Sequence, residues 1–184
     1  MSDKMKLRIV GFCILAAFLL FGGGMGLLAQ GHVNLGVNLV LLNSVAVIAI
    51  GFLLAPIMTA TGSAHGATYR AARVLEGTVL AISIFVTQSG QQLLGMSADN
   101  FYQIAMVALG LGSLPMCLWL IRSTRISNWI GILGFVGYSC LILSMILAAL
   151  GFETASLALL PPGALFEIIL GGLLLMGFKL KPQI

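Results

Sequence analysis

The chain has 184 residues, of which 60% are hydrophobic and 8% are charged, and its formal net charge at pH 7 is +4. Soluble domains carry roughly 25% charged residues, so this composition excludes an ordinary soluble protein and predicts an integral membrane protein. The positive charge needs no nucleic-acid partner, because basic residues near a membrane surface contact anionic lipids.

A membrane-spanning helix needs about 20 mostly apolar residues, since each residue adds about 1.5 Å and the hydrocarbon layer is about 30 Å thick. Runs of this kind cover residues 9–29, 36–58, 74–94, 101–121, 129–150 and 160–178. The connections between them are short, so consecutive helices are expected to pack antiparallel. The sequence therefore predicts an all-α fold: a polytopic transmembrane bundle of six helices that forms one domain over residues 1–184.

The basic residues all fall on one side of the predicted bundle. They precede the first span, separate the second from the third, and follow the fourth and the sixth: Lys4, Lys6, Arg8, Arg70, Arg73, Arg122, Arg125, Lys179 and Lys181. The loops on the other side contain His32, Asp99 and Glu153 but no Lys or Arg. The positive-inside rule therefore predicts that both termini lie in the cytoplasm.

The first two predicted spans carry glycine, asparagine and proline. The first contains FGGGMG at residues 21–26, where we expect close helix packing, with a hinge as the alternative. Asn43 lies inside the second span. We expect its amide to form an interhelical hydrogen bond, and a ligand contact is the alternative. Pro56 is expected to end this span.

The third predicted span begins with YRAARVLEG, residues 69–77. Tyr69 is expected at the membrane interface, and Arg70 at the edge can extend its charge toward water. Arg73 and Glu76 are three residues apart on one helix face, so we expect an ion pair. An unpaired charge inside a span costs about 2.5 to 3.5 kcal/mol, so the pair should face the bundle. The alternative is that Arg73 only sets the topology and Glu76 is its local partner.

Polar residues continue along the third and fourth predicted spans. Ser83 and Thr87 follow Glu76 at helical spacing, and Gln103 begins a similar stripe in the fourth span beside Tyr102. The polar residues where these two spans meet form either a polar mouth or an ordinary headgroup boundary. Pro115 is expected to kink the fourth span.

The last two predicted spans contain closely spaced glycines and one isolated acid. Gly131, Gly134 and Gly137 predict close packing of the fifth span. The sixth starts at Pro161, because proline suits the first turn of a helix. Glu167 follows about one and a half turns from the outer side, with no basic residue near it in sequence.

Two interpretations of Glu167 are open. Burial disfavours a charged carboxylate, so a neutral Glu167 could donate a structural hydrogen bond to Asn43, Gln103 or a backbone carbonyl. Alternatively, Glu167 is a proton or cation site, or a polar anchor for a bound substrate.

No cofactor or metal site is predicted, and no catalytic residue can be assigned. His32 and His65 fall on opposite sides of the membrane and so cannot share a haem or a metal ion. The cysteines lie inside spans without metal-ligand spacing. The sequence also lacks a nucleophile elbow, an HExxH motif, a phosphate loop and a dinucleotide fingerprint.

Several segments together resemble a known family. They are LLNSVAVIAIG, YRAARVLEG, FYQIAMVALGLGSLPMC, RISNWIGILGFVGYS and PPGALFEIILG. In their order, spacing and polar positions they resemble the bacterial six-helix membrane family known as domain of unknown function 4386, over nearly the whole chain. The resemblance implies a small, multi-pass protein of the bacterial inner membrane. This family has no established activity, so no residue role is carried over.

Three functions are compatible with these features. The preferred one is binding or transport of a small or amphipathic molecule in a polar pocket inside the bundle. The candidate ligand-binding or polar-network residues are Asn43, Arg73, Glu76, Ser83, Thr87, Tyr102, Gln103 and Glu167. The second is a structural or accessory subunit with a membrane-protein partner or a second copy of itself. The third, an intramembrane enzyme acting on lipid through Glu76 or Glu167, ranks lowest because such chemistry needs a second positioned group. In each case membrane lipids are the expected surroundings.

Overall fold

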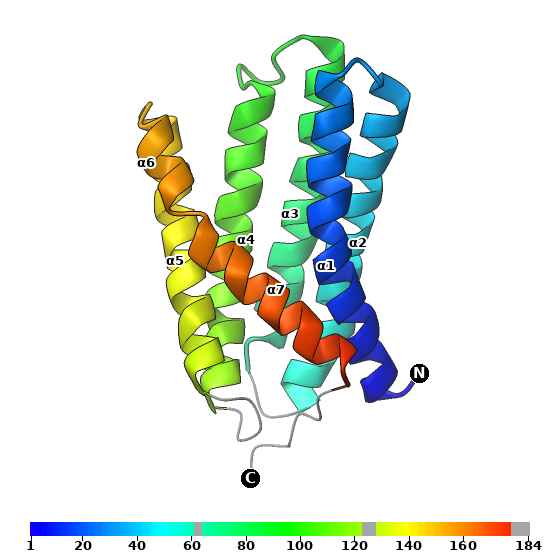
Figure 1. Cartoon of the computed structure of the whole chain (residues 1–184), viewed down its shortest axis with the longest axis vertical. Helices are drawn as coiled ribbons and strands as arrows, with labels where there is room; N and C mark the ends of the chain where they lie inside the picture. The colour runs from blue at the N-terminus through cyan, green and yellow to red at the C-terminus, as the bar shows by residue number, and fades with distance from the viewer. Residues whose placement is uncertain (61–63, 123–127, 178–184) are drawn as a thin grey trace.

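A computed structural model describes residues 1–60, 64–122 and 128–177 of the chain (Figure 1). These residues form helices and contain no strand. The helices are α1 (Asp3–Ala29), α2 (Val33–Ala60), α3 (Gly66–Ser89), α4 (Ala98–Arg122), α5 (Asn128–Ala149), α6 (Glu153–Ala158) and α7 (Pro161–Leu175). Six segments are long and apolar enough to cross a membrane, the sixth running through α6 and α7. The prediction of an all-α, six-span transmembrane fold is confirmed.

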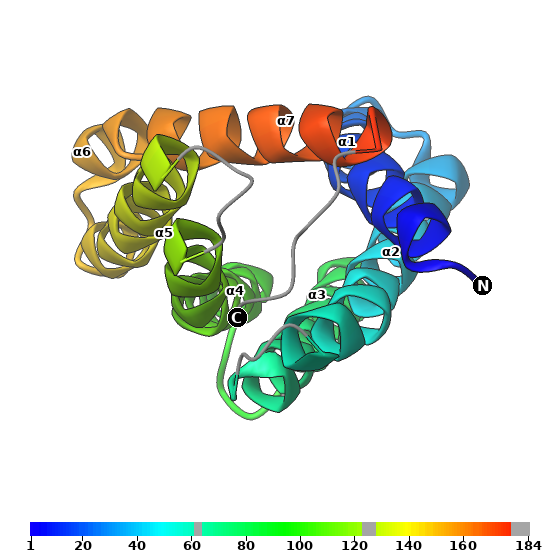
Figure 2. The same cartoon turned by 90° about the horizontal axis from the view of Figure 1, so that it is seen from below.

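The helices form a closed ring. Each helix from α1 to α5 packs on the next one along the chain, and α7 packs on both α5 and α1. Figure 2 shows α7 along one side of the ring, with α3 on the side facing it. Large buried side chains fill the inside, among them Tyr69, Tyr138 and Phe166. A chain folded in this way brings side chains from distant spans together at its centre.

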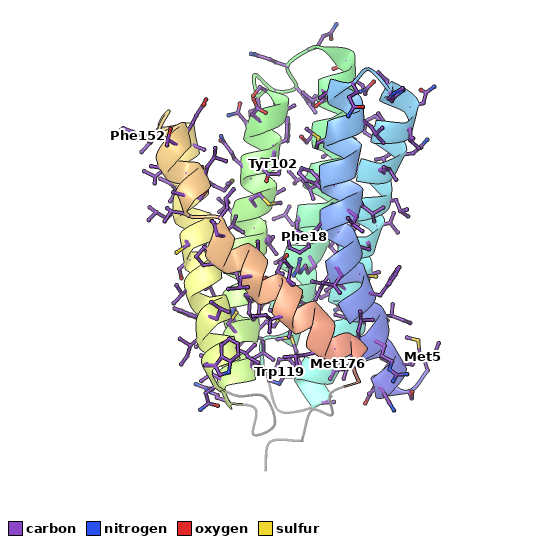
Figure 3. All side chains as sticks on the ribbon, viewed as in Figure 1. Met5, Phe18, Tyr102, Trp119, Phe152 and Met176 are labelled. Carbon is purple, nitrogen blue, oxygen red and sulfur yellow. The ribbon has the colours of Figure 1, made fainter. Side chains whose placement is uncertain are left out.

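The outer surface of the ring is apolar. Phe12, Phe52 and Phe85 are all more than half exposed, and Figure 3 shows side chains such as Phe152 and Met5 directed away from the bundle. Apolar side chains on the outside match a lipid solvent, in which the backbone polar groups are satisfied within each helix. The fold therefore implies contact with membrane lipids.

The described basic residues gather at one end of the bundle. This end holds the start of α1, the first turns of α3 and the last turn of α4 (Figure 1). The residues are Lys4, Lys6, Arg8, Arg70, Arg73 and Arg122. Arg125, Lys179, Lys181 and the predicted end of the sixth span at residue 178 lie outside the described residues.

The second and third spans differ from their predicted limits. Helix α2 continues through Pro56 to Ala60, so the prediction that Pro56 ends it is wrong. A membrane bundle tolerates such a proline, because neighbouring groups can form hydrogen bonds with the backbone carbonyl that proline leaves without its intrahelical partner. Helix α3 begins earlier than predicted and ends at Ser89, where Gly90 adopts a left-handed φ of 62° that terminates a helix. Helix α4 also continues past Pro115, and the kink there stays a prediction.

The sixth predicted span is one continuous helix, α7, and a short helix that the sequence did not predict, α6, precedes it. Helix α7 starts at Pro161, as expected for proline in a first turn. Its 15 residues reach only about 22 Å, less than a hydrocarbon layer of about 30 Å. The short helix α6 precedes it, at the end of the bundle away from Asp3 (Figure 1). The Ser144 hydroxyl holds α6 on α5 by donating to the Ser156 carbonyl at 2.8 Å.

Glycines allow α7 to dock backbone to backbone on both neighbours. A Cβ on Gly137 of α5 would lie 2.8 Å from the Cα of Gly163, and a Cβ on Gly11 of α1 would lie 2.6 Å from the carbonyl oxygen of Gly171. Only residues without a side chain permit such approaches, which are a common means of helix association in membranes. These two seams fix the position of α7 across the ring.

The predicted glycine contacts are confirmed for α5 and only partly for α1. Added Cβ atoms on Gly131, Gly134 and Gly137 would all meet neighbouring helices. In FGGGMG, however, only Gly24 packs closely, against α2, whereas an added Cβ on Gly22, Gly23 or Gly26 would meet nothing within 4 Å. The expectation of tight packing is wrong for these three glycines, because no other helix of the described chain approaches them that closely.

Candidate functional site

Helix α3 carries an ion pair inside the ring. Arg73 donates from Nη1 to Glu76 Oε2 at 3.0 Å and from Nε to the Tyr69 hydroxyl at 3.0 Å. The exposed fractions are only 4% for Arg73 and 2% for Glu76. The three residues share one stripe because they are four and three positions apart. The predicted pair is confirmed, whereas Tyr69 is fully buried and is not an interface residue.

The second acid of the core is held by a tyrosine from another helix. Tyr138 of α5 donates its hydroxyl to Glu167 Oε1 of α7 at 2.8 Å, and the rings of Tyr138 and Phe166 meet edge to face beside it. The predicted partners Asn43, Gln103 and a backbone carbonyl are therefore wrong for this oxygen. The reason is the Gly137–Gly163 seam, which brings α7 onto α5.

Glu167 also lies deeper in the bundle than its sequence position indicated. The predicted depth was counted from Pro161, as if the sixth helix began at the membrane surface. Helix α6 occupies that outer part, and α7 begins partway along the bundle (Figure 1). The carboxyl group of Glu167 is consequently within Coulombic range of both Arg73 and Glu76. The two acids and one base form a single cluster of ionisable side chains.

A cavity of about 260 Å³ adjoins this cluster. Its polar lining consists of Asn43, Glu76, Tyr102 and Glu167, and the rest is apolar surface from α1, α3 and α4. Two further lining residues, Phe18 and Gly22 of α1, are exposed at its rim. Figure 3 shows Phe18 and Tyr102 on the neighbouring flanks of α1 and α4. We call this space the inner cavity; it connects the buried Glu76 and the half-buried Glu167 with the outer surface of the bundle.

Asn43 presents an unpartnered oxygen at the inner cavity. Its side chain is 3% exposed, and its Oδ1 atom has no hydrogen-bond partner among the described residues. The interhelical bond predicted for Asn43 is therefore not made by this atom. A buried acceptor without a partner costs about 1 to 3 kcal/mol. A hydrogen-bond donor that entered the cavity would recover that energy.

A second cavity of about 230 Å³ lies next to the first, and we call it the outer cavity. It is lined by Ser83, Thr87 and Asp99 together with apolar side chains. Phe21 and Tyr102 line both cavities. Their rings stack with centroids 5.5 Å apart and planes inclined by 14°. The stacked pair therefore stands between the two spaces.

The predicted site residues occupy four different places. Asn43, Glu76, Tyr102 and Glu167 line the inner cavity. Ser83 and Thr87 line the outer cavity. Arg73 does not line either cavity but pairs with Glu76, which lines the inner one. Gln103 lines neither cavity.

Phe21, Tyr69 and Tyr138 belong to the site but were not predicted as parts of it. The spacing of Tyr69 from Arg73 could have indicated the first contact. Nothing local in the sequence pairs Tyr138 with Glu167, because the two residues are 29 positions apart.

Replacing Tyr138 with phenylalanine should lower the free energy of unfolding by about 0.5 to 1.5 kcal/mol, the net contribution of a typical hydrogen bond. The measurement is equilibrium unfolding in mixed detergent micelles. Ser139→Ala is the matched control, because that exposed hydroxyl bonds only within its own helix, to the Phe135 carbonyl. Equal stability of Tyr138→Phe and the wild type would show that this bond contributes nothing to the fold.

The comparisons with known proteins give one match. A family model described as "Domain of unknown function (DUF4386)" matches residues 25–177. No curated protein and no solved structure matches the chain. The match covers α2 to α7, and the residues of α1 at the rim of the inner cavity precede it. Because the model covers well over half of the chain, the protein belongs to the DUF4386 family.

Proposed function

We propose that the protein binds a small or amphipathic molecule in the inner cavity. The observation that carries this proposal is the unpartnered, buried Asn43 Oδ1 atom beside Glu76 and Glu167 in an otherwise apolar space. Ligand sites typically combine an apolar lining with a few fixed polar groups. The rigid ion pair behind Glu76 and the Tyr138 hydroxyl on Glu167 hold two of these polar groups in place.

The cellular setting belongs to the same proposal. The described basic residues gather at one end of the bundle, which supports a cytoplasmic location of that end. We therefore place the protein in a bacterial cytoplasmic membrane with both termini inside, so that the outer cavity lies on the opposite side. The closed ring of helices supports a single domain.

A cavity-filling variant tests the binding function. Gly22 lines the inner cavity, and a Cβ there would meet nothing within 4 Å. Gly22→Leu should therefore fold normally and fill the cavity. We expect native mass spectrometry to detect small molecules retained by the purified wild-type protein. Gly22→Leu should retain at least about tenfold less of them, which corresponds to a loss of about 1.4 kcal/mol in binding free energy.

Gly26→Leu is the matched control. Gly26 is one turn further along the same face, has equal free space, and lines neither cavity. It should retain bound molecules like the wild type. A wild-type protein that carries no small molecule, or a Gly22→Leu variant that retains as much as the wild type, would contradict the proposed function.

The glycines of α1 favour a second function, that of an accessory subunit. Gly22 and Gly26 are four residues apart, which is the GxxxG spacing by which membrane helices pair, and nothing in the described chain covers them. If they pack on a partner helix, Gly26→Leu and Gly22→Leu should both break an assembly seen by native mass spectrometry. If only Gly22→Leu, and not Gly26→Leu, loses its bound small molecules, the result supports ligand binding in the inner cavity rather than an interface with a partner helix.

A further inference from the structure

We infer that the ligand of the inner cavity is an organic cation: an ammonium-type group joined to an apolar body. This inference rests on the proposed binding function. Three separate observations support it: the charged residues that line the cavity are acidic, aromatic rings form part of its wall, and most of its lining is apolar.

The charged residues that line the two cavities are all acidic. Glu76 and Glu167 line the inner cavity, and Asp99 lines the outer one. Within the described part of the chain, no Lys, Arg or His residue lines either space. Acidic residues of the inner and the outer cavity would therefore repel an anionic ligand, in surroundings where screening by water is weak.

Only one of the two inner acids is neutralised by a described basic residue. Arg73 pairs with Glu76. Among the described residues Glu167 forms no ion pair, and the hydrogen bond to its Oε1 atom comes from the neutral Tyr138 hydroxyl. Two carboxyl groups thus share one guanidinium. A cationic group beside Glu167 would complete the charge balance of a site from which uncompensated charge is otherwise excluded.

The other groups of the wall suit an ammonium-type cation. Asn43 Oδ1 is a free acceptor for an N–H donor or a polarised C–H group. The rings of Phe18, Phe21 and Tyr102 also line the cavity, and aromatic faces attract organic cations. A neutral apolar molecule would leave the Asn43 oxygen without a hydrogen-bond partner and would offer the Glu167 carboxyl group no counter-charge.

A bare metal ion fits the cavity less well than an organic cation. Hard cations require about six oxygen ligands. Within residues 1–60, 64–122 and 128–177, no group of three or more His, Cys, Asp or Glu residues could hold a metal ion. Most of the lining is apolar surface, which instead accommodates a carbon skeleton. The cationic group then lies at Glu167 and Asn43, and the apolar body extends toward the exposed rim at Phe18 and Gly22.

Benzyltrimethylammonium is a suitable probe, because it joins a quaternary ammonium group to one aromatic ring. The uncharged molecule of the same shape, neopentylbenzene, is the matched competitor. We expect equilibrium dialysis with the full chain in a nonionic detergent to show saturable binding of the cation. The neutral molecule should compete at least about tenfold less well, a difference of about 1.4 kcal/mol, because it lacks the positive charge that the aromatic faces and the carboxyl groups attract.

Glu167→Gln tests the position of the cationic group. It should weaken binding of benzyltrimethylammonium about tenfold or more, because it replaces the carboxyl group that would balance the charge of the cation with a neutral amide of similar size. Glu153→Gln is the acidic control: Glu153 is exposed at the start of α6 and lines neither cavity, so binding should not change. If Glu167→Gln does not fold, the competition with neopentylbenzene still tests the charge of the ligand, and Gly22→Leu, which alters no charge, tests whether the probe lies in the inner cavity.

The outcomes separate this inference from the proposed function. Equal affinity of folded Glu167→Gln and wild type, or preference for neopentylbenzene, would overturn the assignment of a cation. If the probe does not bind but Gly22→Leu still loses retained small molecules, binding in the cavity stands and its ligand is not an organic cation. If both experiments are negative, both proposals fail.

Discussion

Replacing Arg73 with leucine is expected to lower the free energy of unfolding by about 3 to 5 kcal/mol, the cost of breaking a buried ion pair by removing one partner. The substitution leaves the Glu76 carboxylate buried without its counter-charge, and it also removes the donor to the Tyr69 hydroxyl. The measurement is equilibrium unfolding in mixed detergent micelles, followed by circular dichroism.

Three further variants show whether the unpaired charge causes the loss. In Arg73→Leu with Glu76→Leu, most of the stability should return, because a buried ion pair can be replaced by apolar residues at little cost. Arg73→Lys should restore only part of it, since one ammonium group cannot reproduce a guanidinium that bonds Tyr69 and Glu76 from separate nitrogens. Arg70→Leu, at an exposed position on the same helix, should cost less than about 1 kcal/mol. If Arg73→Leu were no less stable than Arg70→Leu, the ion pair would have no structural role.

The double variant Gly11→Ala with Gly137→Ala should lower the free energy of unfolding by about 2 to 6 kcal/mol. Each new methyl group would meet the backbone of α7 at less than 3.0 Å, and overpacking of this kind costs roughly 1 to 3 kcal/mol per site. The two seams lie at opposite ends of α7 (Figure 2), and the effects of distant sites add. The same unfolding assay measures the two single variants and their sum.

Gly172→Ala is the control for these seams. It adds the same methyl group to α7, at a position where nothing lies within 4 Å of the added Cβ. Its stability should match or slightly exceed that of the wild type, because alanine favours a helix over glycine. A double variant as stable as Gly172→Ala would mean that α7 does not depend on backbone contact with α1 and α5.

The spans and the local ion pair could be predicted from the sequence for a physical reason. Hydrocarbon thickness dictates a long apolar run for each crossing, and an acid three residues after a base on one helix lies within reach of it. Both rules act along one segment of chain. The pairing of Arg73 with Glu76 and the start of α7 at Pro161 therefore follow from helical spacing and residue type alone.

The rest of the site depends on contacts between segments. Helix α6 was not predicted, because its six residues are too few to show a helical pattern of their own. The partner of Glu167 follows from a glycine seam that brings α7 onto α5 rather than onto α2 or α4. The unpartnered oxygen of Asn43 and the stacking of Phe21 on Tyr102 likewise follow from ring closure. Periodicity within one span contains no information about these distances.

The placement of Arg73 and Glu76 on one helix also bears on how the chain enters the bilayer during synthesis. A base and an acid that meet across one turn neutralise each other as soon as that turn forms, so α3 can leave the translocation machinery before any later span exists. Glu167 obtains its hydrogen bond from Tyr138, which lies earlier in the chain and is already in the membrane when α7 arrives. The order of the spans therefore gives Glu76 its counter-charge within its own helix and gives Glu167 a hydrogen-bond donor from a span that is made before it.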